Sequence, residues 1–380
     1  MGSIYNGSST CSDLLDCCLR GEAWSADLLD RAIAVDEGRA LLSIVVERLA
    51  DLFEPRLCEV YARLFTQVIA RVAPELGPRV RLRGTAAQHP PSSTDRVYVL
   101  SRVTLGADIA VTSVMLDAAK RRYPDAEIVF VGPRKSYEMF EADSRIRHFP
   151  APYARAGSLQ DRLRASASLW IEDGVVIDPD SRLTQLGLLS ICDEHRYFFF
   201  ESRSHGGDGH EALPALAARW AREVFGVEDA RPFIAPAAPT EVSAEITVSL
   251  GVGENPNKRL GDRFERQLFR MLAGRSVLVD KGGSAEERER VERALQPGMR
   301  THEGSFAPFA AQIARSKLFI GYDSAAGHVA SACRVPLISI FAGAVSERML
   351  ERWKPNGQVI RGEDPEVLEK VRCALCDLLS

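Results

Sequence analysis

Three polar side chains stand among small residues in the stretch GYDSAAGHVASA, residues 321–332. The apolar run KLFI precedes it and VPLISIF follows, which predicts a strand, a tight turn and a helix that begins near Ser324. Because a helix N-terminus has unpaired N–H groups and a partial positive charge, this turn suits a phosphate group. Ser324 could cap the helix or donate to the phosphate, and His328 lies one turn further on the same face. The alternative is tight packing of a helix on a sheet, with Gly and Ala as spacers.

A second turn could serve the same anion. GVGENPNKR, residues 251–259, follows an apolar strand and contains Gly251, Gly253 and Lys258, which could supply backbone amides and one ammonium group. It is neither a P-loop nor a dinucleotide fingerprint, because GxxxxGK[ST] and a third Gly after G-x-G are both absent. A lysine in such a loop is often only solvated, and this alternative stays open.

A third turn, TLGADIAVTS at residues 104–113, contains a carboxylate. Gly106 permits a tight turn and Asp108 opens the next helix. Asp108 could be an N-cap, or it could act as a general base if an acceptor hydroxyl comes within hydrogen-bond reach.

The elements that position these turns follow from hydrophobic periodicity. Residues 12–75 place apolar side chains at helical spacing, with Ser25 as a cap and Pro55 at a helix start, and no strand is evident. After the turn-rich linker HPPSST, strand and helix patterns alternate with short loops, which predicts a parallel sheet with helices on both faces. The alternation restarts after the linker APAAPTE, residues 235–241.

The fold class predicted from this order is α/β, with two doubly wound Rossmann-like domains that face a cleft. The expected division is an N-terminal helical unit at residues 1–90, a first Rossmann-like domain at 95–236 and a second at 242–380. Ligands bind at the carboxyl ends of the strands in such sheets, where the three turns are expected.

Composition and charge exclude several classes of protein. The 380 residues are 46% hydrophobic and carry a net charge of −4, which does not favour nucleic acid as a partner. No apolar run approaches the roughly 18 residues of a membrane span, and the N-terminus does not resemble a secretory signal. The eight cysteines are therefore expected to be free thiols.

The order of LGAD, NKRL and DSAAGHVA resembles glycosyltransferase family 9, the ADP-heptose lipopolysaccharide heptosyltransferases. VLVDKGGSAEERERVERAL, residues 277–295, is similar to the strand, Gly-rich turn and Glu-bearing helix of that family. The resemblance covers about residues 95–360 and implies the GT-B fold. The last motif is fairly specific, whereas the others are informative mainly through their order.

The resemblance implies that residues 95–236 are the acceptor-side domain and residues 242–380 the donor-binding domain. It also implies roles for individual residues. Asp108 would be the catalytic base, with Gly106 and Arg203 on the acceptor side. Donor diphosphate binding is assigned to Lys258, Asp323, Ser324, Ala325, Gly327 and His328. The donor nucleoside is assigned to Gly253, Glu254 and Glu287.

This chain departs from the family pattern at three places. Ala107 is inserted between Gly106 and Asp108, which would shift the carboxylate. Ala325 replaces a Gly, and a positive φ there would be costly for Ala. The helices within residues 1–90 lie outside the resemblance, and they could bind a protein partner, mediate self-association or pack on their own chain.

The function expected is that of an inverting, metal-independent glycosyltransferase that moves a sugar, a heptose among the options, from a nucleotide-diphosphate donor to an acceptor hydroxyl. The alternatives are a noncatalytic nucleotide-sugar-binding scaffold and a nucleotide-sugar epimerase. The acceptor would be a glycan, glycolipid or protein, as in lipopolysaccharide biosynthesis. No cofactor is expected besides the donor substrate, such as ADP-heptose, and the location would be cytoplasmic, with the inner face of the membrane as an option.

Two other stretches could bind a metal ion, but their patterns are weaker than those of the three turns. Asp178 and Asp180 form a D-x-D triplet, but Pro179 between them favours a turn. The stretch HGGDGH, residues 205–210, could bind zinc, yet it offers no fourth ligand and suits an acceptor-side loop better. No metal site is therefore expected.

Overall fold

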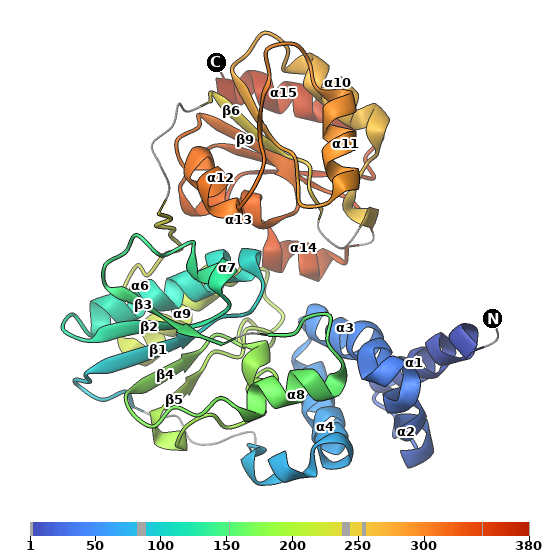
Figure 1. Cartoon of the computed structure of the whole chain (residues 1–380), viewed down its shortest axis with the longest axis vertical. Helices are drawn as coiled ribbons and strands as arrows, with labels where there is room; N and C mark the ends of the chain where they lie inside the picture. Colours follow the sequence, from blue (N-terminus) through green and yellow to red (C-terminus); the bar gives the residue numbers. More distant parts are fainter. Residues whose placement is uncertain are drawn as a thin grey trace. The chain divides into compact units, whose positions relative to one another are not determined.

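The computed structural model describes residues 3–81, 89–151, 153–237, 244–252, 256–343 and 345–379 (Figure 1). The chain divides into two compact units. Unit 1 comprises Met1–Val103, Ala118–Arg134 and Arg145–Ala230. Unit 2 comprises Thr104–Asp117, Lys135–Ser144 and Arg231–Ser380. The domain boundaries expected from the sequence stay a prediction.

Unit 1 contains a five-stranded, fully parallel sheet. Its strands are β1 (Arg96–Leu100), β2 (Glu127–Gly132), β3 (Ile146–Pro150), β4 (Val175–Asp178) and β5 (Tyr197–Phe199). The strand order is β3-β2-β1-β4-β5, with β1 at the centre. The four residues Val97–Leu100 of β1 are buried, as expected for a strand covered on both faces.

Helices surround this sheet and precede it in the chain. The helices of unit 1 are α1 (Ser3–Arg20), α2 (Ala26–Ala34), α3 (Glu47–Asp51), α4 (Pro55–Val72), α8 (Leu159–Ala167) and α9 (Leu213–Phe225). Shorter helical turns are η1 (Val35–Gly38), η2 (Leu41–Val46), η3 (Pro74–Arg79), η5 (Arg182–Thr184) and η6 (Glu194–Arg196). Ser25 caps α2 and Pro55 begins α4, as the sequence predicts.

The N-terminal helices pack on their own chain. One hydrophobic core joins α1–α4, for example Leu64 and Phe65, to Leu159 of α8 and to Leu189 in the loop after β4. Backbone pairing adds to this core, since Val80 and Leu189 form an antiparallel bridge. Of the three roles considered for these helices, packing on their own chain is therefore realised.

The apolar spacing of residues 25–53 is that of one long helix, but the structure interrupts it. Asp36 and Glu37 adopt positive φ values of 46° and 54°, and the chain turns there between α2 and η2. The periodicity of apolar residues continues across the turn, which is why the pattern alone predicts one helix.

Unit 2 contains a six-stranded parallel sheet. Its strands are β6 (Ile246–Ser249), β7 (Val277–Asp280), β8 (Arg300–His302), β9 (Leu318–Tyr322), β10 (Leu337–Phe341) and β11 (Gln358–Arg361). The strand order is β11-β10-β9-β6-β7-β8. The central strands β6 and β9 carry the turns that the sequence analysis singled out.

Helices cover both faces of this second sheet. They are α10 (Asp262–Met271), α11 (Ala285–Ala294), α12 (Phe306–Ile313), α13 (Ala325–Ala332), α14 (Glu347–Trp353) and α15 (Val367–Leu379), with the short turn η7 (Pro256–Lys258). Ile320 of β9 joins the core formed with α10, α11 and α15. On the opposite face, α13 packs against β9 and β10, where a Cβ on Gly327 would stand 3.9 Å from Phe319 and Ser339.

The segment after β1 forms α5 (Leu105–Ala107) and the π-helical turn η4 (Asp108–Thr112), both in unit 2. It continues into α6 (Ser113–Arg122), which spans the boundary between the units, as does α7 (Arg134–Tyr137). The stretch RKSYEMFEAD, residues 134–143, has a helical pattern, but only its first four residues form α7.

Other features agree with the sequence. All eight cysteines are free, and Cys373 and Cys376 are exposed on α15. Among the described residues, no helix combines the length and the apolar character that crossing a bilayer requires. The two parallel sheets confirm the doubly wound architecture.

The contact between β9 and β6 leads to a stability prediction. An added Cβ on Gly321 would stand 2.6 Å from the backbone oxygen of Ser249, which cannot move without disturbing β6. We expect Gly321→Ala to lower the free energy of unfolding of unit 2 by about 1–3 kcal/mol, measured by urea denaturation. Gly283→Ala is the control, because no atom lies within 4 Å of its Cβ position. Equal effects of the two substitutions would contradict the packing argument.

Candidate functional site

The turn between β9 and α13 holds an unsatisfied hydroxyl. Ser324 is the N-cap of α13 with extended backbone angles, φ −156° and ψ 174°, but its side chain caps no N–H group. Its Oγ is buried, and no described residue is its hydrogen-bond partner. A buried polar atom without a partner is costly, so a ligand that accepts from this hydroxyl would relieve the cost.

His328 is held at the same end of α13. It is 9% exposed, and its ring makes a T-shaped contact with Trp353 at 5.7 Å between centroids. Burial lowers the pKa of His328. The charge of Lys258 lowers this pKa further, whereas the charge of Asp323 raises it. The imidazole is therefore neutral at pH 7 and can donate one N–H.

Lys258 lies at this turn as well. Its Nζ is 2.6 Å from Oδ2 of Asp323. The next residue fixes this placement, since Arg259 donates two hydrogen bonds of 2.8 Å to the buried carboxylate of Glu265 on α10. Leu260 N–H also donates to the hydroxyl of Tyr322, at 3.2 Å.

Two small residues of α13 adopt ordinary helical conformations. Ala325 is the first residue of the helix and has no positive φ, so replacing the family's Gly causes no backbone strain here. Gly327 is buried two residues later, and its N–H donates to the carbonyl of Ser324 at 3.2 Å.

Asp108 lies beneath α13 within unit 2. The carboxylate is fully buried, and its Oδ1 accepts a 2.8 Å hydrogen bond from Thr112 Oγ1. α13 packs against α5 and η4, and an added Cβ on Gly106 would stand 3.1 Å from Cδ2 of His328 and 3.4 Å from Cα of Ala325. A Cβ at this position would push the His328 ring away by a few tenths of an ångström, which is a physical reason for Gly at position 106.

Glu287 caps its own helix and approaches the loop after β6. Its Oε2 accepts hydrogen bonds from the N–H groups of Gly283 and Ser284, at 3.0 and 3.1 Å. Its Oε1 lies 3.6 Å from the place a Cβ would take on Gly251. Gly253 and Glu254, the other residues assigned to the nucleoside, lie outside the described residues.

Arg203 belongs to unit 1 and is buried in a polar network. It is 4% exposed, and its Nε donates to Asp180 Oδ2 at 3.0 Å. Its guanidinium lies 5.0 Å from the ring centroid of Tyr61. A role of Arg203 in contacting the acceptor stays a prediction.

The D-x-D triplet is part of the same network. Asp178 accepts hydrogen bonds from Ser181 N–H at 2.6 Å and from the hydroxyls of Thr184 and Tyr197, both at 2.5 Å. Protein donors thus occupy both of its oxygens. The described residues contain no cluster of His, Cys, Asp and Glu side chains that could hold a metal ion.

Two groups near the site have no motif signal. Trp353 contacts His328 from α14, a helix that the sequence analysis did not identify. Asp280 ends β7, where it accepts from Ser249 Oγ at 3.2 Å, and burial raises its pKa. The position of Asp280 at a strand end is a signal that could have found it; the contact of Trp353 is visible only in the structure.

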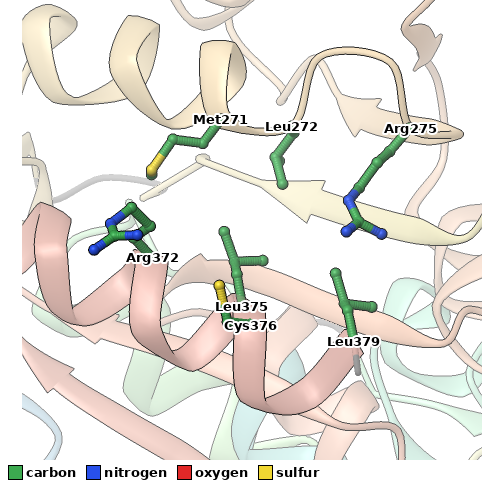
Figure 2. Close-up of a pocket in the computed structure, with 7 residues that line it drawn as sticks. All are labelled: Met271, Leu272, Arg275, Arg372, Leu375, Cys376 and Leu379. Atoms are coloured by element: carbon green, nitrogen blue, oxygen red, sulfur yellow. The ribbon is translucent and has the colours of Figure 1, made fainter.

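Figure 2 shows a pocket of about 370 Å³ between α10 and α15. It is lined by Met271, Leu272, Arg275, Arg372, Leu375, Cys376 and Leu379. None of the residues assigned to the donor line this pocket. The pocket lies where α10 leads into the start of β7, whereas the residues assigned to the donor follow the ends of strands.

A protein-family comparison bears on these motifs. The model of Glycosyltransferase family 9 (heptosyltransferase) matches residues 258–375, from the site lysine to α15. This part of the chain is similar to glycosyltransferase family 9. The resemblance inferred from the motifs is confirmed, as is the prediction that the chain is a glycosyltransferase.

Solved structures of family 9 enzymes share the fold. The heptosyltransferase WaaC of E. coli with ADP is 14% identical, covers 74% of this chain and 99% of its own, and has a TM-score of 0.55. A glycosyl transferase family 9 protein from Veillonella parvula is 15% identical, with 77% and 99% coverage and a TM-score of 0.56. The ADP-heptose lipopolysaccharide heptosyltransferase II of E. coli is 17% identical, with 75% and 100% coverage and a TM-score of 0.50. These likenesses confirm the GT-B fold. No curated protein matches the sequence.

The buried network of unit 1 leads to a prediction on pH. Burial raises the pKa of Asp178 from 3.8 to about 6, although hydrogen bonds from Thr184, Tyr197 and Ser181 oppose it. The folded chain therefore binds more protons than the unfolded chain between these two values, and stability falls as pH rises through this range. We expect unit 1 to lose about 2–3 kcal/mol between pH 4 and pH 7 through this group, and Asp178→Asn to lack that loss.

Urea denaturation at several pH values measures this difference. The exposed Asp16 provides the control variant Asp16→Asn, which should retain the pH dependence of the unaltered chain. Parallel stability curves for Asp178→Asn and the unaltered chain would refute the assignment.

Proposed function

We propose that the chain transfers a sugar from a nucleotide-diphosphate donor to an acceptor hydroxyl, with inversion and without a metal ion. The observation that carries the proposal is the unpartnered hydroxyl of Ser324 at the N-terminus of α13, beside the ammonium group of Lys258. A hydroxyl, an ammonium group and the N–H groups of a helix are the donors that a diphosphate accepts from.

The same groups would stabilise the leaving diphosphate. Negative charge grows on it in the transition state, and Lys258, Ser324 and the dipole of α13 lie where they can offset that charge. The neutral His328 adds one N–H donor. Metal independence is supported by this set of protein donors, which perform the neutralisation that a cation performs in other transferases.

Asp108 is the proposed general base. Thr112 donates to Oδ1 of this carboxylate, which would take a proton from the acceptor hydroxyl. The activated oxygen would attack the anomeric carbon from the side opposite the diphosphate, which inverts the configuration. Because the carboxylate is fully buried, the acceptor can reach it only after the contact between η4 and α13 loosens.

Glu287 supports a nucleoside site beside the diphosphate. Its Oε2 is used in capping α11, while Oε1 is directed toward Gly251 and could accept from a ribose hydroxyl. WaaC is described with ADP and heptosyltransferase II as an ADP-heptose enzyme, so ADP-heptose is the donor to test first. The acceptor we propose is a glycan of lipopolysaccharide biosynthesis, and a cytoplasmic location stays a prediction.

Donor binding is tested with ADP. We expect ADP to raise the Tm of the unaltered chain, because a ligand that binds the native state stabilises it. Ser324→Ala should weaken ADP binding roughly 10- to 150-fold, the equivalent of one hydrogen bond to a charged group. Ser305→Ala is a matched control, since Ser305 is the N-cap of α12 and its side chain also caps no N–H group. Equal ADP affinities of both variants would refute the diphosphate site.

Catalysis is tested with Asp108→Asn. Transfer from ADP-heptose to a heptose-free lipopolysaccharide core oligosaccharide should fall about 10²–10⁴-fold in kcat, while the affinity for ADP is unchanged. Thr112→Val should cause a smaller loss, because the carboxylate stays in place without its orienting donor. Unchanged turnover by Asp108→Asn would exclude this base. Turnover of the donor without any acceptor would favour an epimerase or a hydrolase instead.

A further inference from the structure

The loop after β4 lies at a topologically special place. In the order β3-β2-β1-β4-β5, the chain proceeds outward in one direction from β1 through β2 and in the other through β4. Ligands of parallel sheets bind at the carboxyl ends of the strands at such a switch point. The segments concerned are residues 101–103 after β1 and residues 179–190 after β4.

Backbone strain gathers in these two segments. Val103, Asp180, Gln185 and Leu186 have φ values of 60°, 71°, 52° and 59°, a region that residues other than Gly rarely adopt. Each such residue costs of the order of 1 kcal/mol or more and persists only where its surroundings enforce it. Strain of this kind is concentrated at ligand sites rather than in ordinary connections.

The loop also buries polar groups at a cost. Asp180 Oδ1 and Arg203 Nη1 are buried and have no hydrogen-bond partner among the described residues. The two side chains are joined by the 3.0 Å bond from Arg203 Nε to Asp180 Oδ2, and Ser202 Oγ donates to the same oxygen at 2.8 Å. A hydrophobic loop would be cheaper for stability alone.

An N-terminal helix holds this loop from outside the sheet. Tyr61 of α4 is 2% exposed, and its hydroxyl donates to the carbonyl of Gln185 at 3.1 Å, within the strained segment. Its ring faces the Arg203 guanidinium at 5.0 Å and stacks on Phe65 at 5.4 Å. Tyr61 thus contacts both the strained segment and Arg203. It lies 124 residues from Gln185 in the sequence.

The segment that follows the helices provides a second attachment. Arg81 N–H donates to the carbonyl of Leu188 at 2.8 Å, and Ser190 N–H donates to the carbonyl of Arg79, also at 2.8 Å. The Arg81 guanidinium binds both carboxylate oxygens of Glu194, at 2.9 and 2.5 Å. The loop is therefore fixed at its middle by α4 and at its end by residues 79–81.

We propose that the N-terminal helices are a structural part of the acceptor site. α4 and residues 79–81 hold the loop of residues 179–190 in the strained conformation that binds the hydroxyl groups of a glycan acceptor, and Tyr61 is the positioning residue. This inference rests on the proposed function.

The test compares two tyrosines. Tyr61→Phe removes only the hydroxyl that donates to Gln185. Tyr123→Phe is the matched control: Tyr123 is 3% exposed and its hydroxyl donates to the carbonyl of Pro91 at 3.1 Å, in the same unit. Both variants should lose a comparable amount of Tm. Only Tyr61→Phe should accelerate hydrogen exchange in residues 179–190 and raise the Kd for the heptose-free core oligosaccharide about five- to tenfold, with ADP affinity unchanged.

Each other outcome overturns the inference. Unchanged exchange in residues 179–190 would show that Tyr61 does not hold the loop. Faster exchange with unchanged oligosaccharide affinity would show that the loop does not bind the acceptor, as would failure of the unaltered chain to bind the oligosaccharide. An equal loss of oligosaccharide affinity in Tyr123→Phe would show that general destabilisation causes the loss seen in Tyr61→Phe. Failure of the unaltered chain to bind ADP would instead refute the proposed function.

Discussion

The ion pair between Lys258 and Asp323 determines how the donor side of the structure is arranged. An ammonium group placed near the N-terminus of a helix is repelled by the partial positive charge there. Asp323 offsets this repulsion because its carboxylate lies 2.6 Å from Nζ, at the residue immediately before the N-cap Ser324. With Arg259 fixed on Glu265, the ammonium group stays beside α13 even without a bound anion. The side chains are only partly exposed, 24% and 12%, so the pair is less screened than a surface pair.

The fold could be predicted where strands are buried on both faces. β1, β2, β4 and β9 are continuous apolar runs and follow from hydrophobicity alone. The strands missed are the edge strands β3, β8 and β11. Their sequences IRHFP, RTH and QVIR alternate or are mostly polar because one side faces solvent. Their existence depends on a neighbouring strand that offers hydrogen bonds, and no local pattern records that neighbour.

The residues of the candidate site, too, could be predicted only where the sequence pattern is local. Ser324, His328 and Lys258 could be named from the sequence because a helix N-terminus and its small residues form a local pattern. Even the inserted Ala107 has a local solution, since the π-helical turn Asp108–Thr112 encloses one residue more than an α turn and can absorb the insertion. Trp353 and Tyr61 could not be found in this way. Each acts through a partner 25 or 124 residues distant, and only tertiary packing brings such pairs together.

The two candidate sites are built differently. The proposed donor site uses a turn, a helix terminus and one ion pair, which depend on few residues close in sequence. The loop after β4 instead combines positive φ values, a buried Asp180–Arg203 pair and unpartnered polar atoms, and none of these stabilises the fold by itself. The free energy that offsets them comes from the shared core of α1–α4, α8 and Leu186–Leu189. A chain that carries such a cost needs the additional helices, and this links the N-terminal extension to the loop more directly than to the sheet it precedes.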